Sequence, residues 1–257
     1  MNISKVLIAC DSNYFANMYP LVRKMWKSIC GYDCTVIFIG DELPDVLKKD
    51  GYRDDEVILF KKIENMHTAF QSQCIRVLYP ALMEGYIMTS DMDIVPLRKN
   101  HYELPIQKCG KDDFVTFTDR YTREKMYAIC YNVASSEVWS KLFNIKTEED
   151  VRKVLKNWYS ECPNYDGRKN CEGWYTDQKK LFMTVSSYPN LRVLNDSETN
   201  FCRLDKKHKI YIVQNRNEVI NDIKSQRYSD FHFIKPYAKF NKVINMLTDA
   251  AISQIKT

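Results

Sequence analysis

Apolar runs typical of buried strands alternate with amphipathic helix patterns in the first half of the chain, and this alternation constrains the fold more than any other feature. The strand-like runs cover residues 5–10, 34–39, 56–60 and 86–91. The helix-like segments, with apolar side chains at helical spacing, cover residues 15–28 and 68–83. Strands that alternate with helices at this pitch predict a parallel sheet with helices on both faces, which is a three-layer α/β fold.

The second half of the chain has a more mixed pattern. Strands are expected over residues 114–117, 126–133, 191–194, 210–213 and 231–234. Helices are expected over residues 136–143, 147–159, 175–183 and 239–255. Thr147 and Asp150 match a capping box, in which two side chains satisfy backbone N–H groups at the start of a helix. Because the sequence contains no repeat and no Pro/Gly/Ser linker, we expect one α/β domain with an elaborated second half.

The composition is that of an ordinary soluble protein, with 257 residues, of which 45% are hydrophobic and 28% charged. No apolar stretch is long enough to span a bilayer, and the short apolar run near the N-terminus does not lead to a signal-peptide cleavage site. The nine cysteines are an odd number without metal-ligand spacing. They favour a reduced, cytoplasmic protein, with a disulfide framework as the alternative.

The charge distribution bears on the kind of partner. A net charge of +5 suits a polyanionic small ligand as well as nucleic acid. A nucleic-acid binder, however, is expected to cluster its basic residues, whereas here they are interleaved with acidic ones. The chain has only 7 glycines, which argues against a glycine-rich phosphate loop. We therefore expect a small anionic ligand and no nucleic-acid partner.

The segment YIMTSDMDIVPL, residues 86–97, places two carboxylates at the end of an apolar run. Asp91 and Asp93 are one residue apart, and Asp11 likewise ends the first apolar run. Parallel α/β sheets bind ligands at the carboxyl ends of their strands, where these aspartates fall. Carboxylate oxygens suit Mg²⁺ and Mn²⁺, which complete their coordination with substrate phosphates. A metal site is therefore one interpretation, and a solvated turn with two surface aspartates is the other.

The sequence around these aspartates resembles glycosyltransferase family 8, the nucleotide-sugar glycosyltransferases that include glycogenin and galactinol synthase. In QSQCIRVLYPALMEGYIMTSDMDIVPL, Arg76 and Tyr79-Pro80 stand where that family has an arginine-bearing helix before its metal-binding Asp-x-Asp strand. The resemblance implies that Asp91 and Asp93 bind the metal, and that Arg76 and Ser90 contact the donor. The chain is also similar to short virus-encoded, glycan-building members of this fold.

The N-terminal segment VLIACDSNYFANMYPLVRKMWKSI resembles the opening strand, polar turn, tyrosine and helix of the same family. By this resemblance the nucleotide base lies against Ala9, Asp11 and Tyr14. For Tyr14 the alternative is an aromatic side chain that caps the following helix and packs on the sheet.

Two segments of the second half resemble the donor-sugar site of the family. In MYAICYNVASSEVWSKLF, Asn132 corresponds to an asparagine that contacts the donor, although Val133-Ala134 replace the expected Ser-Gly. In WYTDQKKLF, the resemblance places Asp177 and Gln178 beside the donor sugar. Asp177 is the first candidate for the carboxylate near the anomeric carbon, and Asp119 is the second, with a surface loop as its alternative role.

The segment DFHFIKPYAKF resembles the closing His-Phe segment of the family. The resemblance makes His232 the third metal ligand and Lys235 a contact of the diphosphate. The usual glycine is missing, and Lys235 comes three residues earlier than in the family, so Lys239 is the alternative.

Taken together, the resemblance implies a three-layer α/β/α fold of the GT-A type, with a mixed, mainly parallel central sheet. It implies a single glycosyltransferase domain over residues 1–257, with a nucleotide-binding half (1–100) and an acceptor-binding half with a C-terminal segment (101–257). The implied reaction is metal-dependent transfer of a hexosyl or pentosyl group from a nucleoside diphosphate, most simply UDP, to a hydroxyl of a glycan or other acceptor. The cofactor is then Mn²⁺ or Mg²⁺.

Two other classes of function remain as alternatives. DMDIV matches the Asp-x-Asp-x-Val pattern of haloacid dehalogenase-type phosphatases, with Asp91 as nucleophile and Asp93 as acid/base. The acidic pair Asp112-Asp113, however, precedes its expected strand instead of ending one. The other alternative is a non-catalytic module that binds a sugar nucleotide.

Overall fold

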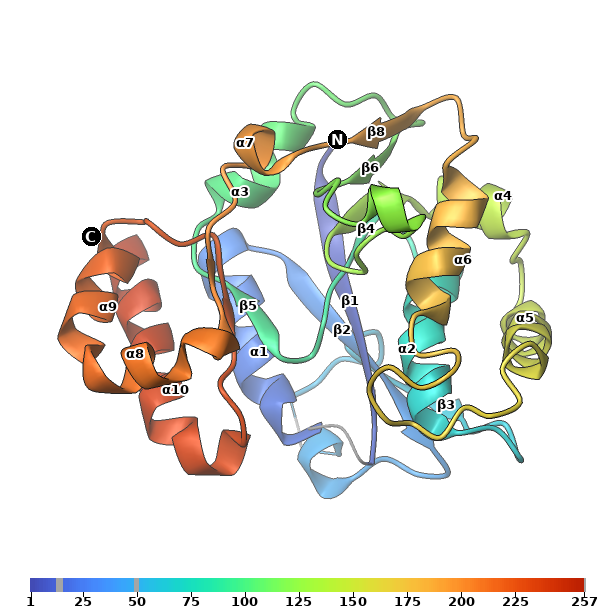
Figure 1. Cartoon of the computed structure of the whole chain (residues 1–257), viewed down its shortest axis with the longest axis horizontal. Coiled ribbons are helices and arrows are strands. Elements are labelled where there is room, and N and C mark those ends of the chain that lie inside the picture. The colour runs from blue at the N-terminus through green and yellow to red at the C-terminus, as the bar shows by residue number, and fades with distance from the viewer. Residues whose placement is uncertain (13–15, 49–50, 257) are drawn as a thin grey trace.

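The computed structural model describes residues 1–12, 16–48 and 51–256, and its centre is one large β-sheet (Figure 1). In the described residues this sheet has seven strands in the order β3-β2-β1-β4-β7-β6-β8. Their bounds are Ile3–Asp11 (β1), Asp33–Gly40 (β2), Val57–Lys61 (β3), Tyr86–Thr89 (β4), Phe114–Thr116 (β6), Asn132–Ser135 (β7) and Leu191–Val193 (β8). Only β7 runs antiparallel to its neighbours β4 and β6. The predicted mixed, mainly parallel sheet is confirmed.

Helices cover both faces of this sheet (Figure 1). The α-helices of the described residues are Tyr19–Met25 (α1), Thr68–Leu78 (α2), Asn100–Glu103 (α3), Ser136–Phe143 (α4), Glu148–Ser160 (α5), Thr176–Val185 (α6), Asp196–Thr199 (α7), Lys209–Gln214 (α8), Arg216–Lys224 (α9) and Tyr237–Ser253 (α10). The predicted capping box of Thr147 and Asp150 is present at the start of α5. None of these helices, within the part of the chain that is described, is long and apolar enough to cross a membrane.

Strand β1 separates two hydrophobic cores. Its side chains Val6, Ile8 and Cys10 belong to one core, and Leu7 and Ala9 belong to the other. Successive side chains of a strand point to opposite faces of the sheet, so each face has its own core. Helices α1, α3, α8, α9 and α10 contribute to the first core, and α2, α4, α5 and α6 contribute to the second. The layers are therefore helix, sheet and helix, as the alternating pattern predicts.

A second, small sheet connects distant parts of the chain. It consists of β5 (Ile94–Pro96), β10 (Asp230–His232) and β9 (Arg203–Leu204), in the order β5-β10-β9. His232 is paired with Ile94 across antiparallel strands, and the N–H of Phe233 donates to the carbonyl of Asp93 at 2.8 Å. This pairing brings the C-terminal segment against the residues that follow β4.

Two expected strands are wrong. The segment 210–213 lies in helix α8, where Ile212 is fully buried and Ile210 is 72% exposed. In a strand these two side chains would share a face, so their unequal burial fits a helix and not a strand. The strand expected over 126–133 begins only at Asn132. A short apolar run does not distinguish a strand from other buried backbone, which explains both errors.

The short elements β5, α3, α7 and β9 and the helix α9 were not predicted, and other differences are at element ends. The expected helix 68–83 ends as α2 at Leu78 and continues as a 3₁₀ turn, Tyr79–Leu82. Pro80 explains this end, because proline lacks an N–H and disfavours helical backbone at the residue before it. All nine cysteines lie in the described residues, and each is a free thiol.

Candidate functional site

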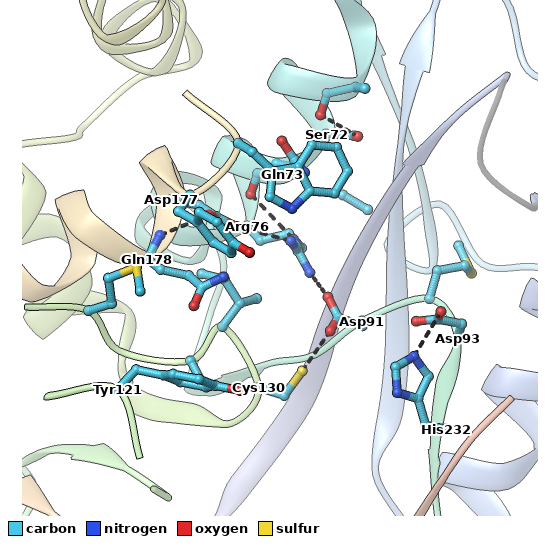
Figure 2. Close-up of a pocket in the computed structure, with 18 of the residues that line it drawn as sticks. Ser72, Gln73, Arg76, Asp91, Asp93, Tyr121, Cys130, Asp177, Gln178 and His232 are labelled. Carbon is cyan, nitrogen blue, oxygen red and sulfur yellow. Dashed lines mark hydrogen bonds and ion pairs between the residues drawn. The ribbon is translucent and has the colours of Figure 1, made fainter. Parts of the chain in front are cut away.

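A cavity of about 590 Å³ lies at the carboxyl ends of β1 and β4 (Figure 2). Among the described residues that line it are Ala9, Arg76, Asp91, Asp93, Asp177 and His232. These residues come from β1, from α2, from the segment after β4, from α6 and from β10. The cavity is at the edge of a parallel sheet where such folds bind ligands.

Arg76 lies between two carboxylates at the floor of this cavity (Figure 2). It projects from the last turn of α2 and is 8% exposed. Its Nη1 pairs with Asp91 Oδ1, and its Nη2 donates to Asp177 Oδ2 at 3.2 Å. Burial opposes its charge, but the two carboxylates outweigh that effect and raise the pKa of Arg76. A buried guanidinium with two partners in this way holds both acidic side chains in place.

Asp177 is the most deeply buried of the predicted catalytic residues, with 3% of its surface exposed. It stands in the first turn of α6, where its Oδ1 accepts from the N–H of Gln178 at 2.8 Å. Desolvation raises the pKa of Asp177 to about 6, although Arg76 opposes the shift. The Gln178 side chain lines the same cavity. A carboxyl whose pKa is raised in this way has a property that is common among acid/base groups.

Asp93 has a different, strongly basic environment. Its Oδ2 is 3.1 Å from His232 Nε2, 2.8 Å from Lys235 Nζ and 3.8 Å from Lys206 Nζ. Burial alone would raise the pKa of Asp93, but the hydrogen bond from His232 and the charges of these three groups lower it well below the ordinary value. This group of side chains joins a carboxylate to three nitrogen bases at the edge of the cavity.

The three predicted metal ligands have the right donor types for Mn²⁺ or Mg²⁺, since they offer carboxylate oxygens and an imidazole. The structure brings Asp93 and His232 into contact. Asp91 instead faces Arg76, and its Oδ2 accepts from the Cys130 thiol at 2.9 Å. Over residues 1–12, 16–48 and 51–256, no group of three or more His, Cys, Asp or Glu side chains is arranged to hold an ion. The donors fit the ion chemically, and Asp91 is the one that lies apart from the other two.

The residues predicted to receive the base lie at the end of β1. Ala9 lines the cavity. Asp11 is fully buried and its Oδ2 accepts from Thr68 Oγ1 at 2.7 Å, which joins the end of β1 to the start of α2. Tyr14 lies outside the described residues.

Two other predicted donor contacts lie behind the cavity wall. Ser90 is fully buried, and its carbonyl accepts from Arg76 Nη1 at 3.3 Å. Asn132 is also fully buried, and its Nδ2 donates to the carbonyls of Ala128 and Ile129 at 2.8 and 2.7 Å. Because Ala128 and Ile129 line the cavity, Asn132 shapes the wall from behind.

The alternatives for two predicted residues take other positions. Lys239 is exposed, and its Nζ lies 5.7 Å from the ring centre of Phe240. Lys235, by contrast, contacts Asp93 directly. Asp119 is exposed, and its carbonyl accepts from Thr122 Oγ1 at 2.6 Å in a surface turn. Of the two carboxylates considered for the donor sugar, Asp177 is the one that lines the cavity.

Lys206, Arg203 and Cys130 are among the cavity residues that have no part in the sequence predictions. Arg203 and Lys206 belong to RLDKKHK (203–209), a run rich in basic residues. This run is the sequence feature from which they could have been predicted as contacts of an anionic ligand. Nothing in the sequence pattern around Cys130 points to its contact with Asp91.

Comparison with known proteins identifies the architecture. No protein-family model matches the chain, and no curated protein sequence does. The apo form of the glycosyltransferase GlyE from Streptococcus pneumoniae TIGR4 superposes over 99% of this chain and 63% of its own, with a TM-score of 0.52 and 10% identity. The galactosyltransferase LgtC, solved with donor and acceptor sugar analogs, superposes over 97% of this chain and 95% of its own, with a TM-score of 0.50 and 9% identity. The fold is that of GT-A glycosyltransferases.

The GT-A fold agrees with the fold class predicted from sequence. The chain spans 63% of the length of GlyE and nearly the full length of LgtC. In this GT-A fold the cavity is lined by Asp91 and Asp93, which follow β4, and by Asp177 of α6, so the three acidic side chains singled out in the sequence line one site.

Proposed function

We propose that this protein is a metal-dependent glycosyltransferase that moves a sugar from a nucleoside diphosphate, most simply UDP, to a hydroxyl acceptor. The observation that carries this proposal is the placement of Asp93, His232, Lys206 and Lys235 in one contact group at the edge of the cavity. A diphosphate needs concentrated positive charge, and two lysines beside a carboxylate–imidazole pair supply part of it.

The cation, Mn²⁺ or Mg²⁺, is assigned to Asp91, Asp93 and His232. When bound, it neutralises charge that develops on the departing diphosphate. Lys206 and Lys235 would bind the diphosphate as fixed cations. In the net reaction the bond between the anomeric carbon and the diphosphate oxygen breaks, a bond to the acceptor oxygen forms, and the acceptor proton is released.

Asp177 is assigned to the donor sugar, with Gln178 beside it. Arg76 orients the Asp177 carboxylate and balances its charge when it is ionised. In an inverting reaction this carboxylate accepts the proton of the acceptor hydroxyl, and in a retaining reaction it positions the sugar. The nucleotide base is assigned to the end of β1, with Ala9, Asp11 and Tyr14.

The acceptor is assigned to the aromatic wall of the cavity. Tyr121, Trp174 and Tyr175 line it, and flat aromatic faces match the C–H faces of sugar rings. Trp174 and Tyr175 immediately precede α6, which begins at Thr176 and carries Asp177. An acceptor sugar on these rings is therefore close to the residue assigned to the reacting carbon.

The test is a thermal-shift panel of UDP-, GDP- and CDP-sugars, each with Mn²⁺ and with EDTA. A ligand that binds only the native state raises the melting temperature, so one nucleotide should give a shift that depends on Mn²⁺. The enzyme should then hydrolyse the corresponding sugar nucleotide slowly or transfer its sugar to a glycan acceptor. No shift with any nucleotide, together with hydrolysis of a generic phosphate ester and a phosphoryl adduct at Asp91, would replace this proposal by the phosphatase.

A further inference from the structure

A second, smaller cavity of about 50 Å³ adjoins the first. The two share four lining residues, Tyr121, Ala128, Cys130 and Arg203, so the small cavity lies directly beside the large one. The remaining wall is mostly aromatic, and His101 is part of it. No residue assigned above to the metal, the diphosphate or the donor sugar lines this small cavity.

His101 has one satisfied and one unsatisfied ring nitrogen. It stands on α3 and is 1% exposed. Its Nδ1 lies 2.7 Å from the carbonyl oxygen of Thr199, which only accepts, so Nδ1 carries a proton and donates. Its Nε2 is buried without a hydrogen-bond partner in the described structure. Burial lowers the pKa of His101, which keeps the ring neutral near pH 7 and leaves Nε2 as an acceptor.

The His101 ring cannot easily turn away to find another partner. It packs edge-to-face against Tyr102, Phe117 and Tyr131, with ring centres 4.7, 5.8 and 6.0 Å away. Phe201 adds a fourth ring at 5.7 Å. The surrounding aromatic rings therefore hold Nε2 in one position. A buried hydrogen-bond acceptor without a protein partner is expected to bind a ligand or a water molecule.

The charged groups of the wall already have partners. Arg203 donates to Asp230 Oδ2 at 2.6 and 2.9 Å, and the Tyr131 hydroxyl donates to the same oxygen at 2.7 Å. Arg120 donates to Asp196 Oδ2 at 2.6 Å. The arginines are thus neutralised, which does not favour an anion. The group that the cavity lacks is a small, uncharged hydrogen-bond donor.

We propose that the small cavity is a subsite for the hydroxymethyl group of a sugar held in the large cavity, with the hydroxyl donating to His101 Nε2. This inference rests on the proposed function and makes it more specific. A CH₂OH group is small enough for a cavity of about 50 Å³. In this arrangement its carbon contacts the aromatic wall and its hydroxyl satisfies the unpartnered Nε2 of His101. A site built around a buried polar atom discriminates strongly against a ligand that lacks the complementary group.

The test compares hexosides with their 6-deoxy counterparts on the protein saturated with UDP and Mn²⁺ in one arm, and UDP-sugars on the protein with Mn²⁺ and no added UDP in the other. One arm uses methyl glucosides and galactosides, which occupy the acceptor position. The other arm uses UDP-glucose and UDP-galactose against UDP-xylose, which lacks the hydroxymethyl group. In one arm, titration calorimetry should show that the ligand without the hydroxyl binds with an affinity lower by roughly tenfold or more. That arm identifies the bound sugar as acceptor or donor. Equal affinities in both arms would overturn the proposal.

Two further measurements separate a hydrogen bond from a structural role. His101→Asn keeps a donor for the Thr199 carbonyl but removes the acceptor, so the tenfold preference should disappear; His208→Asn, at an exposed histidine, should retain it. In wild-type protein, ¹⁵N spectra of the histidine rings should show the Nε2 resonance of His101 moving when the sugar is added. An Nε2 resonance that no sugar moves would mean that the cavity holds water only. UDP affinity, measured first, tests the proposed function separately.

Discussion

Arg76 and Asp177 are 101 positions apart in the sequence, and their side chains form an ion pair of 3.2 Å under the floor of the cavity. The same guanidinium pairs with Asp91, so one cation joins helix α2, the end of β4 and helix α6. Because Arg76 and Asp177 are buried, the loss of either partner should affect the stability of the fold.

Replacing Arg76 by Met should lower the free energy of unfolding by about 3–5 kcal/mol, because it leaves buried Asp177 and half-buried Asp91 without their counter-ion. Adding Asp177→Asn to Arg76→Met should restore part of the loss. Urea denaturation of the two single variants and the double variant measures the coupling. As a control, Lys24→Gln breaks an exposed ion pair with Asp249 and should cost less than about 1 kcal/mol. Additive losses would contradict the pairing of Arg76 with Asp177.

The ionisation of Asp177 should make stability depend on pH. Its folded-state pKa of about 6 is above the ordinary 3.8, so the native state binds the proton more tightly than the unfolded chain. The contribution is complete below about pH 4 and is lost as the pH rises through about 6. Relative to Asp177→Asn, the unfolding free energy of wild type should therefore fall by about 3 kcal/mol between pH 4 and pH 7. If the unfolding free energies of the two proteins changed with pH in parallel, Asp177 would have the same pKa in the folded protein as in the unfolded chain.

The same carboxyl should affect the rate of transfer. If ionised Asp177 is required, transfer by wild type should fall as the pH drops through about 6. In Asp177→Asn, the asparagine keeps a side-chain oxygen that can accept from the N–H of Gln178, so nucleotide affinity should persist while transfer falls by roughly two orders of magnitude or more. Near-normal transfer by this variant would move the role to Asp119.

Replacing either Asp91 or Asp93, the aspartates assigned to the metal, should abolish the effect of Mn²⁺ on UDP affinity. Asp91→Asn and Asp93→Asn each replace a charged ligand by a neutral amide, and calorimetry with Mn²⁺ and with EDTA should then give the same affinity. Asp93→Asn also removes the counter-ion of Lys235 and Lys206, so its metal-free affinity should not decrease. Asp112→Asn, at an exposed position, is the control. A preserved Mn²⁺ effect in both variants would refute the metal assignment.

Lys206 should contribute to diphosphate binding. Lys206→Gln removes a cation that lines the cavity 3.8 Å from Asp93, and UDP affinity should fall roughly tenfold while uridine affinity is unchanged. The neighbouring Lys207 is exposed, so Lys207→Gln should bind UDP like the wild type. Equal losses in the two variants would indicate only a general effect of net charge.

Local patterns in the sequence determined most of the strands and helices. Strand β1 lies where a continuous apolar run places it, because both of its faces are buried. Helix α4 lies where apolar periodicity places it, because burial of one face repeats with the period of a helix. The capping box of Thr147 and Asp150 is equally local. The position of Asp91 and Asp93 after an apolar run was likewise sufficient to place both at a strand end.

Tertiary structure decided which of these residues meet. Whether the segment 210–213 is a helix depends on which side chains the neighbouring elements bury, and its four residues do not contain that information. The pairing of β10 with β5 brings His232 to Asp93, and the packing of α6 against α2 brings Asp177 to Arg76. The unsatisfied nitrogen of His101 likewise results from four aromatic rings contributed by separate segments. Contacts across such separations depend on strand register and helix packing, which no short stretch of sequence specifies alone.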